Sequence, residues 1–200
     1  MKVITLNLKV DANVLPRIFH ILQKGFMVKA RPGCSIHEFL CQQQKINPEY
    51  IAQRISTIFL DGQPVDDIDA AQIEDGCTIA LSGAMPGLVG AVMRRGSPYA
   101  SFRHSITYSK DNNISPPKEG MVRLKLFNIL MKELGPQFLE NGVFLEPSDL
   151  IALMTNQPDD FREGCKEMML NKKPTTFDSL TNIQMVSQGH LVFFSVKTLA

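Results

Sequence analysis

The hydrophobic pattern of the first fifty residues predicts two strands and a helix. Apolar and polar residues alternate from residue 4 to residue 10, which is the period of a strand with one buried face. Residues 26–30 predict a second strand. Ser35 and Glu38 have the spacing of a capping box, so a helix is expected to begin there and to end near Asn47.

Two Asp-Gly pairs divide the next thirty residues. The apolar residues 58–60 lead into Asp61-Gly62 and a short return, and Asp75-Gly76 leads into the apolar run 77–81. Asp-Gly pairs favour tight turns between strands. Together with the preceding elements, this pattern predicts the order strand, strand, helix, strand, strand.

The second half of the chain echoes the first half, in which residues 18–25 predict a short helical turn or loop after the opening strand. It predicts a strand at 122–126, a helix at 129–134, a strand at 142–146, a helix from 147, a helix at 161–170 and a closing hairpin of 183–186 and 191–196. A local likeness between residues 18–24 and 126–132 favours a duplication, and chance similarity of two amphipathic patterns is the alternative. We therefore expect an α+β protein of two tandem modules, residues 1–83 and 121–200, joined by a Gly/Arg-rich central segment and linker of residues 84–120.

The arrangement at residues 58–81 resembles the C-terminal half of a ubiquitin-like β-grasp domain. Within that superfamily it is similar to the small sulfur-carrier proteins of thiamine and molybdopterin biosynthesis, and residues 122–196 look like a diverged copy of the same type. The resemblance implies that each module is a β-grasp, in which a sheet wraps over one helix.

The resemblance also draws attention to the end of the first module. Sulfur carriers end in a Gly-Gly tail that is adenylated and thiolated. The corresponding loop here contains Gly83, Pro86, Gly87 and Gly90, with no Gly-Gly pair and no free carboxylate after it. Carrier chemistry would therefore require proteolysis that frees a glycine. The alternative interpretation is that these glycines form a turn and allow a close approach of the backbone.

The central segment holds a cluster of basic and aromatic residues. Arg94, Arg95, Arg103 and His104 lie there with two aromatic residues among them. Guanidinium groups bind phosphate or carboxylate and aromatic rings stack on bases, so one interpretation is an anion or nucleotide site. The other interpretation is a solvated loop, because no phosphate-binding motif accompanies the cluster.

No motif predicts a catalytic residue, a metal site or a cofactor. Cys34 and Cys41 do not form a CxxC pair, and no spacing of Cys and His fits a zinc site. Cys34 precedes a predicted helix N-terminus, where the helix dipole would stabilise a thiolate. We expect no cofactor and no metal, and the lack of a catalytic motif points away from an enzyme without excluding one.

The net charge and the distribution of apolar residues argue against nucleic acid and membranes as partners. A formal net charge of +1 provides no general attraction to nucleic acid or to a membrane surface. The uncharged run at 76–93 contains Pro86 and several glycines, which argue against a membrane span. The N-terminus lacks the apolar core of a signal peptide, so we expect a cytoplasmic protein with reduced cysteines.

Three functional hypotheses follow from these observations. The first, which we favour, is a non-enzymatic interaction protein that uses a sheet edge or the central segment to bind a partner protein. The second is binding of an anionic small molecule or nucleotide at the arginine cluster. The third is a sulfur-carrier-like protein matured by proteolysis. We expect neither nucleic acid nor a membrane as partner. The sequence does not determine the oligomeric state and does not exclude a dimer.

Overall fold

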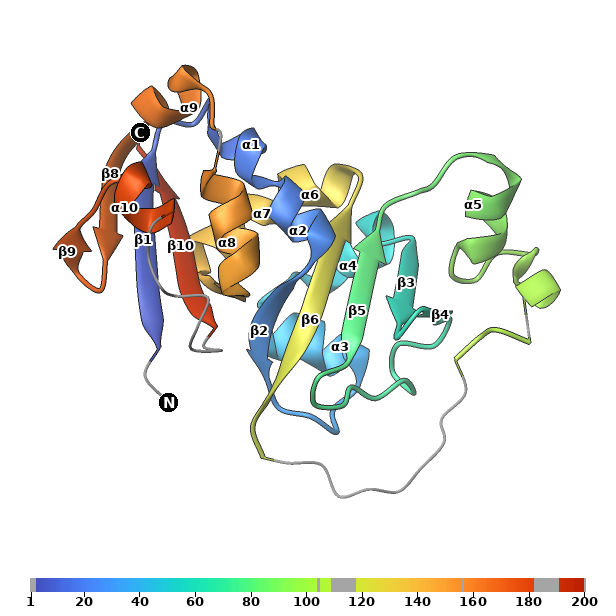
Figure 1. The fold of residues 1–200 in the computed structure, drawn as a ribbon. Helices are drawn as coiled ribbons and strands as arrows, with labels where there is room; N and C mark the ends of the chain where they lie inside the picture. The colour runs from blue at the N-terminus through green and yellow to red at the C-terminus, as the bar shows by residue number, and fades with distance from the viewer. Residues whose placement is uncertain (1–2, 104, 109–117, 156, 182–190, 200) are drawn as a thin grey trace. The chain divides into compact units, whose positions relative to one another are not determined.

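The computed structural model of the protein forms two compact units that are interleaved along the sequence. Unit 1 consists of residues 1–26 and 132–200, and unit 2 consists of residues 27–131. Both units contain helices and strands (Figure 1), so the predicted α+β class is confirmed. The structure describes residues 3–103, 105–108, 118–155, 157–181 and 191–199.

The elements follow one another along the chain in this order. Those before residue 108 are β1 (Ile4–Val10), α1 (Leu15–Ile18), α2 (His20–Lys24), β2 (Phe26–Ala30), α3 (Ile36–Glu38), η1 (Phe39–Gln43), α4 (Pro48–Arg54), β3 (Thr57–Leu60), β4 (Gln63–Pro64), β5 (Thr78–Ser82), α5 (Gly87–Met93) and η2 (Ala100–Arg103). Those after it are β6 (Gly120–Phe127), α6 (Ile129–Glu133), α7 (Gly135–Asn141), β7 (Val143–Leu145), α8 (Pro147–Met154), α9 (Asp159–Gly164), β8 (Cys165–Leu170), β9 (Lys173–Pro174), α10 (Phe177–Thr181) and β10 (Val192–Thr198).

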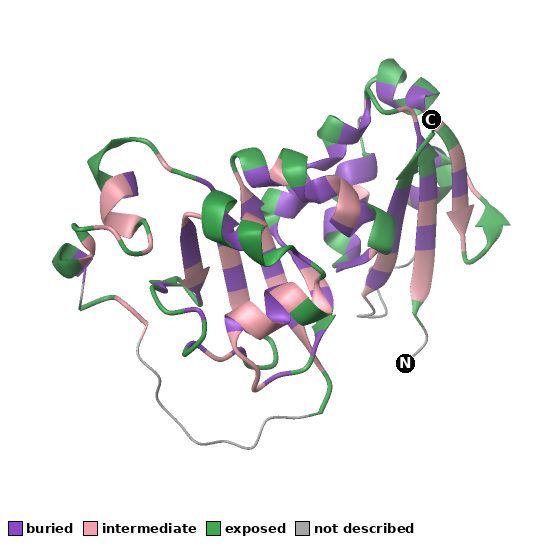
Figure 2. Ribbon diagram, turned by 180° about the vertical axis from the view of Figure 1, so that it is seen from behind, coloured by how far each residue is buried: buried purple, intermediate pink, exposed green. Residues whose placement is uncertain are grey.

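The strands of unit 2 lie in the order β4-β3-β5-β6-β2. β3 pairs antiparallel with β4 and β5, whereas β5 pairs parallel with β6. In the parallel pair Ile79 lies beside Leu124 and Leu81 beside Leu126, and all four side chains are fully buried. Buried and less buried positions alternate along these strands, and α3 and α4 lie against the buried face (Figures 1 and 2).

The helix layer of unit 2 begins as predicted and then differs from the prediction. Ser35 Oγ accepts a hydrogen bond of 3.1 Å from the backbone N–H of Glu38, which caps α3. Beyond η1, Asn47 Oδ1 accepts a hydrogen bond of 2.7 Å from the backbone N–H of Glu49. Asn47 therefore caps a second helix, α4, whose first residue is Pro48.

The strands of unit 1 lie in the order β7-β10-β1-β8-β9. β1 pairs parallel with β10 and antiparallel with β8. Leu6 lies beside Phe194 and Leu8 beside Val196, and these four side chains are buried. The central strands of unit 1 thus come from opposite ends of the chain.

β1 and β6 were predicted to open the first and the second module. In the structure each of them pairs with strands from the other half of the chain. β1 belongs to unit 1 with β8 and β10, and β6 belongs to unit 2 beside β5. The boundaries of unit 1 and unit 2 therefore differ from the predicted boundaries of 1–83, 84–120 and 121–200. An alternating pattern fixes which face of a strand is buried, but it does not fix which strand lies beside it. The β-grasp assignment stays a prediction.

The helix predicted at 161–170 is confirmed for residues 161–164 and is wrong from residue 165 onward. α9 ends at Gly164, and residues 165–170 form β8, which pairs antiparallel with β1. Several of these residues are good helix formers, and pairing with a buried strand overrides that preference. The strand predicted at 191–196 is confirmed as β10, whereas the one predicted at 183–186 lies outside the described residues.

The central segment contains two helices, α5 and η2, that its composition did not predict. α5 follows directly on the loop after β5 and has seven residues. None of the helices in the described ranges has the length and apolar character that a membrane crossing needs.

We expect residues 27–131 to fold alone and residues 1–82 not to. The second fragment lacks β6, whose Val122, Leu124 and Leu126 are fully buried. Burying three such side chains contributes about 5–9 kcal/mol, which is comparable with the whole stability of a small domain. Thermal unfolding followed by circular dichroism should show a cooperative transition for 27–131 only. A cooperative transition of residues 1–82 would show that β6 is dispensable for the core.

Candidate functional site

The sheet of unit 2 has a second face, which we call the open face, on the side away from α3 and α4. Its central row is Phe59, Ala80 and Lys125, which lie beside one another on β3, β5 and β6. These three side chains are only partly buried, whereas their neighbours along each strand are buried in the core. The alternation of the strands therefore places two apolar residues and one cation side by side on the open face.

Residues 83–108, which we call the α5–η2 segment, lead from the end of β5 to the residues that precede β6. Pro86 stands at the N-cap of α5, and Gly87 has a positive φ of 78°. Gly90 packs so closely on Met85 that a Cβ at this position would lie 2.1 Å from the Met85 carbonyl oxygen. Gly87 therefore allows the turn at the start of α5, and Gly90 allows the close packing on Met85.

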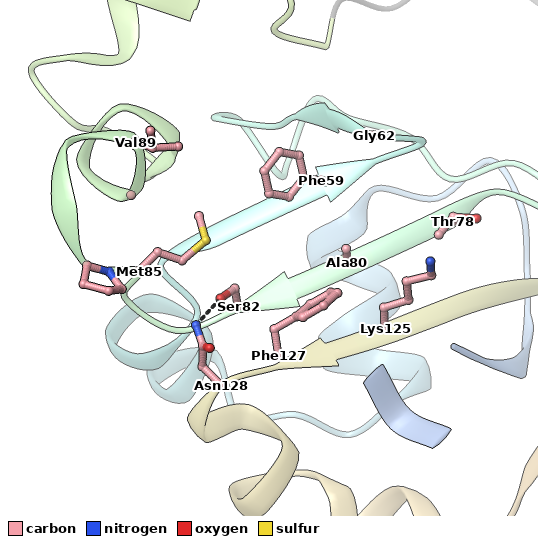
Figure 3. A pocket seen from close by; sticks show the side chains of 12 residues that line it. Phe59, Gly62, Thr78, Ala80, Ser82, Met85, Val89, Lys125, Phe127 and Asn128 are labelled. Carbon is pink, nitrogen blue, oxygen red and sulfur yellow. Dashed lines mark hydrogen bonds between the residues drawn. The ribbon is translucent and has the colours of Figure 1, made fainter. Parts of the chain in front are cut away.

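A pocket of about 630 Å³ lies between α5 and the open face. Met85 and Val89 lie at one end of it and Lys125 lies toward the other (Figure 3). Its apolar lining comes from both sides, namely Phe59, Ala80 and Phe127 from the sheet and Met85, Pro86 and Val89 from the α5–η2 segment. Pro86 and Gly90 of the tail-equivalent loop line this pocket, and Gly83 and Gly87 do not.

The polar groups of the pocket are few. Asn128 Nδ2 donates a hydrogen bond of 3.0 Å to Ser82 Oγ (Figure 3). The backbone N–H of Thr78 donates to Asp61 Oδ1 at 2.7 Å. The Lys125 ammonium has no hydrogen bond or ion pair within the part of the chain that the structure describes. No Asp or Glu lines the pocket, so its lining carries one positive charge.

Arg103 holds the α5–η2 segment together from inside. Its Nε donates to the carbonyl of Val92 at 2.8 Å, and its Nη1 donates to Thr107 Oγ1 at 2.9 Å. Its Nη2 forms an ion pair with Asp66 Oδ1 at 2.6 Å. The side chain of Arg103 is 1% exposed, so this guanidinium group does not face solvent.

Arg95 fixes the same segment to α4. Its Nη2 donates to the carbonyls of Ile51 and Ile55 at 3.3 and 3.0 Å. Burial lowers the pKa of Arg95, and the carboxylates of Asp66 and Asp69 partly offset this effect. Arg95 is therefore a structural contact of the C-terminal turn of α4.

The described members of the predicted anion site have different surroundings. Arg94 is exposed, Arg95 and Arg103 donate to protein acceptors, and His104 lies outside the described residues. Anion binding at these four residues stays a prediction, and among the described members of the cluster Arg94 is exposed, Arg95 is partly buried and Arg103 is buried.

None of the four cysteine thiols has a lowered pKa. Burial, and then the charge of Glu38, raises the pKa of Cys34, which opposes the thiolate expected at that helix N-terminus. Burial raises the pKa of Cys41, and it raises the pKa values of Cys77 and Cys165 to about 11. Among the described residues, no three His, Cys, Asp or Glu side chains gather in an arrangement that could hold a metal ion.

Exposed apolar side chains concentrate on the α5–η2 segment. Of the eight large apolar side chains that are exposed in the described ranges, five form what we call the apolar patch: Leu88, Val89, Tyr99, Phe102 and Ile106. The rings of Tyr99 and Phe102 stack with centroids 6.2 Å apart. α5 and η2 contact each other, so the apolar patch belongs to one small substructure.

Comparisons with known proteins assign no family. The chain matches no protein-family model, no curated protein and no solved structure. Function must therefore be argued from the pocket, the apolar patch and the contacts that position them.

The Arg103→Met variant should lower the free energy of unfolding by about 2–4 kcal/mol, because Asp66 and three further acceptors each lose a hydrogen-bond donor. Arg94→Met, nine residues away in the same segment, should change the free energy by no more than about 0.5 kcal/mol. Urea unfolding at neutral pH compares the two variants with the wild type. Equal midpoints for both variants would contradict the structural role of Arg103.

Proposed function

We propose that this protein is a non-enzymatic interaction protein whose apolar patch binds a partner protein. The observation that carries the proposal is the exposure of Leu88 and Phe102, which are 71% and 76% exposed on a segment that Arg103 fixes internally. Large exposed apolar side chains gathered on one substructure are typical of protein-binding surfaces. The ion pair of the buried Arg103 with Asp66 supports this proposal, because a segment held in one conformation loses less entropy when it binds.

The geometry favours the central segment over the sheet edge as the binding surface. β4 is the edge strand of unit 2 beside β3, and it has only two residues. Such a short edge offers few backbone groups for the addition of a partner strand. The α5–η2 segment instead offers side-chain contacts, including two stacked aromatic rings that suit the buried centre of an interface.

We also propose that unit 2 is a β-grasp domain whose first strand is β6. With β6 placed first, the elements β6, β2, α3–α4, β3 and β5 give the expected order of strand, strand, helix, strand, strand. This reordering makes β6 the first strand and β5 the last strand of the domain, and it accounts for their parallel pairing. The sulfur-carrier alternative stays a prediction that requires cleavage within the tail-equivalent loop.

Affinity purification from cells that produce the protein tests the partner-binding proposal. We expect the Leu88→Asp/Phe102→Asp double variant to lose at least about tenfold of the captured partner, because each charge is placed where the interface excludes water. Both positions are highly exposed, so the free energy of unfolding should change by no more than about 1 kcal/mol.

The Leu199→Asp variant is the matched control, since Leu199 is an exposed apolar residue of unit 1 outside the apolar patch. It should capture the same partner in the same amount as the wild type. Capture of an identical set of proteins by the double variant and the wild type would show that the apolar patch is not the binding surface.

A further inference from the structure

The pocket beneath α5 has the size and the lining of a small-molecule site. Its volume of about 630 Å³ lies within the range of roughly 300–1,000 Å³ that is typical of ligand pockets. Phe59 and Phe127 provide aromatic walls from the sheet, and Met85 and Val89 provide apolar contacts from the other side. The transfer of an apolar chain or ring from water into this pocket is therefore favourable in free energy.

The distribution of polar groups selects the charge of such a ligand. Lys125 follows the buried Leu124 on β6, and strand alternation turns its side chain to the open face. Arg123 lies two residues earlier on the same face of β6, beside Thr78 of the pocket lining, and it has an interaction of its own within the protein. The nearby Asp61 carboxylate already accepts the Thr78 backbone N–H. A cation on an apolar surface favours a carboxylate partner more strongly than it would in water.

The same groups argue against a peptide as the occupant. A peptide brings backbone N–H and C=O groups that need hydrogen-bond partners when they are buried. Asn128 and Ser82 are bonded to each other, and the remaining walls are largely apolar. A ligand with a single polar group at one end satisfies this lining better.

We infer that this pocket binds a free amphipathic monocarboxylate, whose carboxylate pairs with Lys125 and whose apolar part lies on Phe59, Ala80 and Phe127 toward Met85. Val89 belongs both to the apolar patch and to the lining of the pocket, whereas Leu88 and Phe102 do not line the pocket. The inference and the partner-binding proposal are therefore tested at different residues. The pocket is distinct from an anion site at the arginine cluster, since none of those arginines lines the pocket.

Isothermal titration calorimetry of the full chain with decanoate tests the inference. Decyltrimethylammonium, which has the same chain length and the opposite charge, is the matched ligand, and both are used below their micelle concentrations. We expect decanoate to bind at least about tenfold more tightly than the cation. Lys125→Met should weaken decanoate binding about tenfold, which corresponds to about 1.4 kcal/mol.

Two further variants locate the binding. Lys29→Met removes an exposed charge from β2, outside the pocket, and should leave the affinity unchanged. Ala80→Phe fills the floor of the pocket and should abolish binding. Amide chemical shifts provide a second readout in the wild type, where decanoate should perturb Ala80 and Phe127 more than residues of unit 1.

Three results would overturn the inference. The first is that decanoate does not bind the wild type. The second is equal affinity of the wild type and Lys125→Met, which would mean that the charge plays no part. The third is chemical-shift changes that fall outside the pocket. Because the partner-binding test uses Leu88 and Phe102, failure of either experiment leaves the outcome of the other unaffected.

Discussion

The parallel pairing of β5 with β6 is the constraint on which the rest of unit 2 depends. Parallel neighbours cannot be joined by a tight turn, so the chain must cross from the end of one strand to the start of the other. Of this connection the structure describes residues 83–103, 105–108, 118 and 119. A crossover passes over a face of the sheet, and here α5 lies over the open face (Figure 3). The pocket and the apolar patch are thus consequences of strand pairing.

A crossover of this length needs internal contacts to keep one conformation. The ion pair of Arg103 with Asp66, the bonds from Arg95 to α4 and the packing of Gly90 on Met85 provide them. Burying the Arg103 guanidinium group costs desolvation, which its carbonyl, hydroxyl and carboxylate acceptors offset. Arg95 and Arg103 therefore contribute to the order of the segment, and our proposal assigns partner binding to the exposed apolar side chains of the same segment.

Local patterns predicted many elements correctly, because they depend on neighbours in sequence. The alternation at β1, the capping box at Ser35 and the strand at β10 are confirmed by the structure. Strand partners depend on contacts between residues far apart in sequence, and for that reason the positions of β1 and β6 were not predictable from alternation. The strand β8 was mistaken for a helix since its residues have helical propensity and its partner β1 lies about 160 positions away.

The candidate site shows the same difference between local patterns and contacts of residues far apart in sequence. The glycines and the one proline at positions 83–90 indicated the loop that contributes to the pocket, but no sequence pattern connected Arg103 to Asp66 across 37 residues. Lys125 reads in the sequence as an ordinary outward residue of a strand. Its role in the pocket becomes visible only when α5 is placed over the open face, which follows from the β5–β6 pairing.

Native-state hydrogen exchange measured amide by amide tests that pairing most directly. If β6 is a central strand of unit 2, the hydrogen-bonded amides of residues 122–126 should exchange only through global unfolding of the unit. Their opening free energies should then equal those of residues 79–81 in β5. Rapid exchange of the β6 amides beside a well-protected β5 would contradict the pairing, and with it the crossover that positions the pocket and the apolar patch.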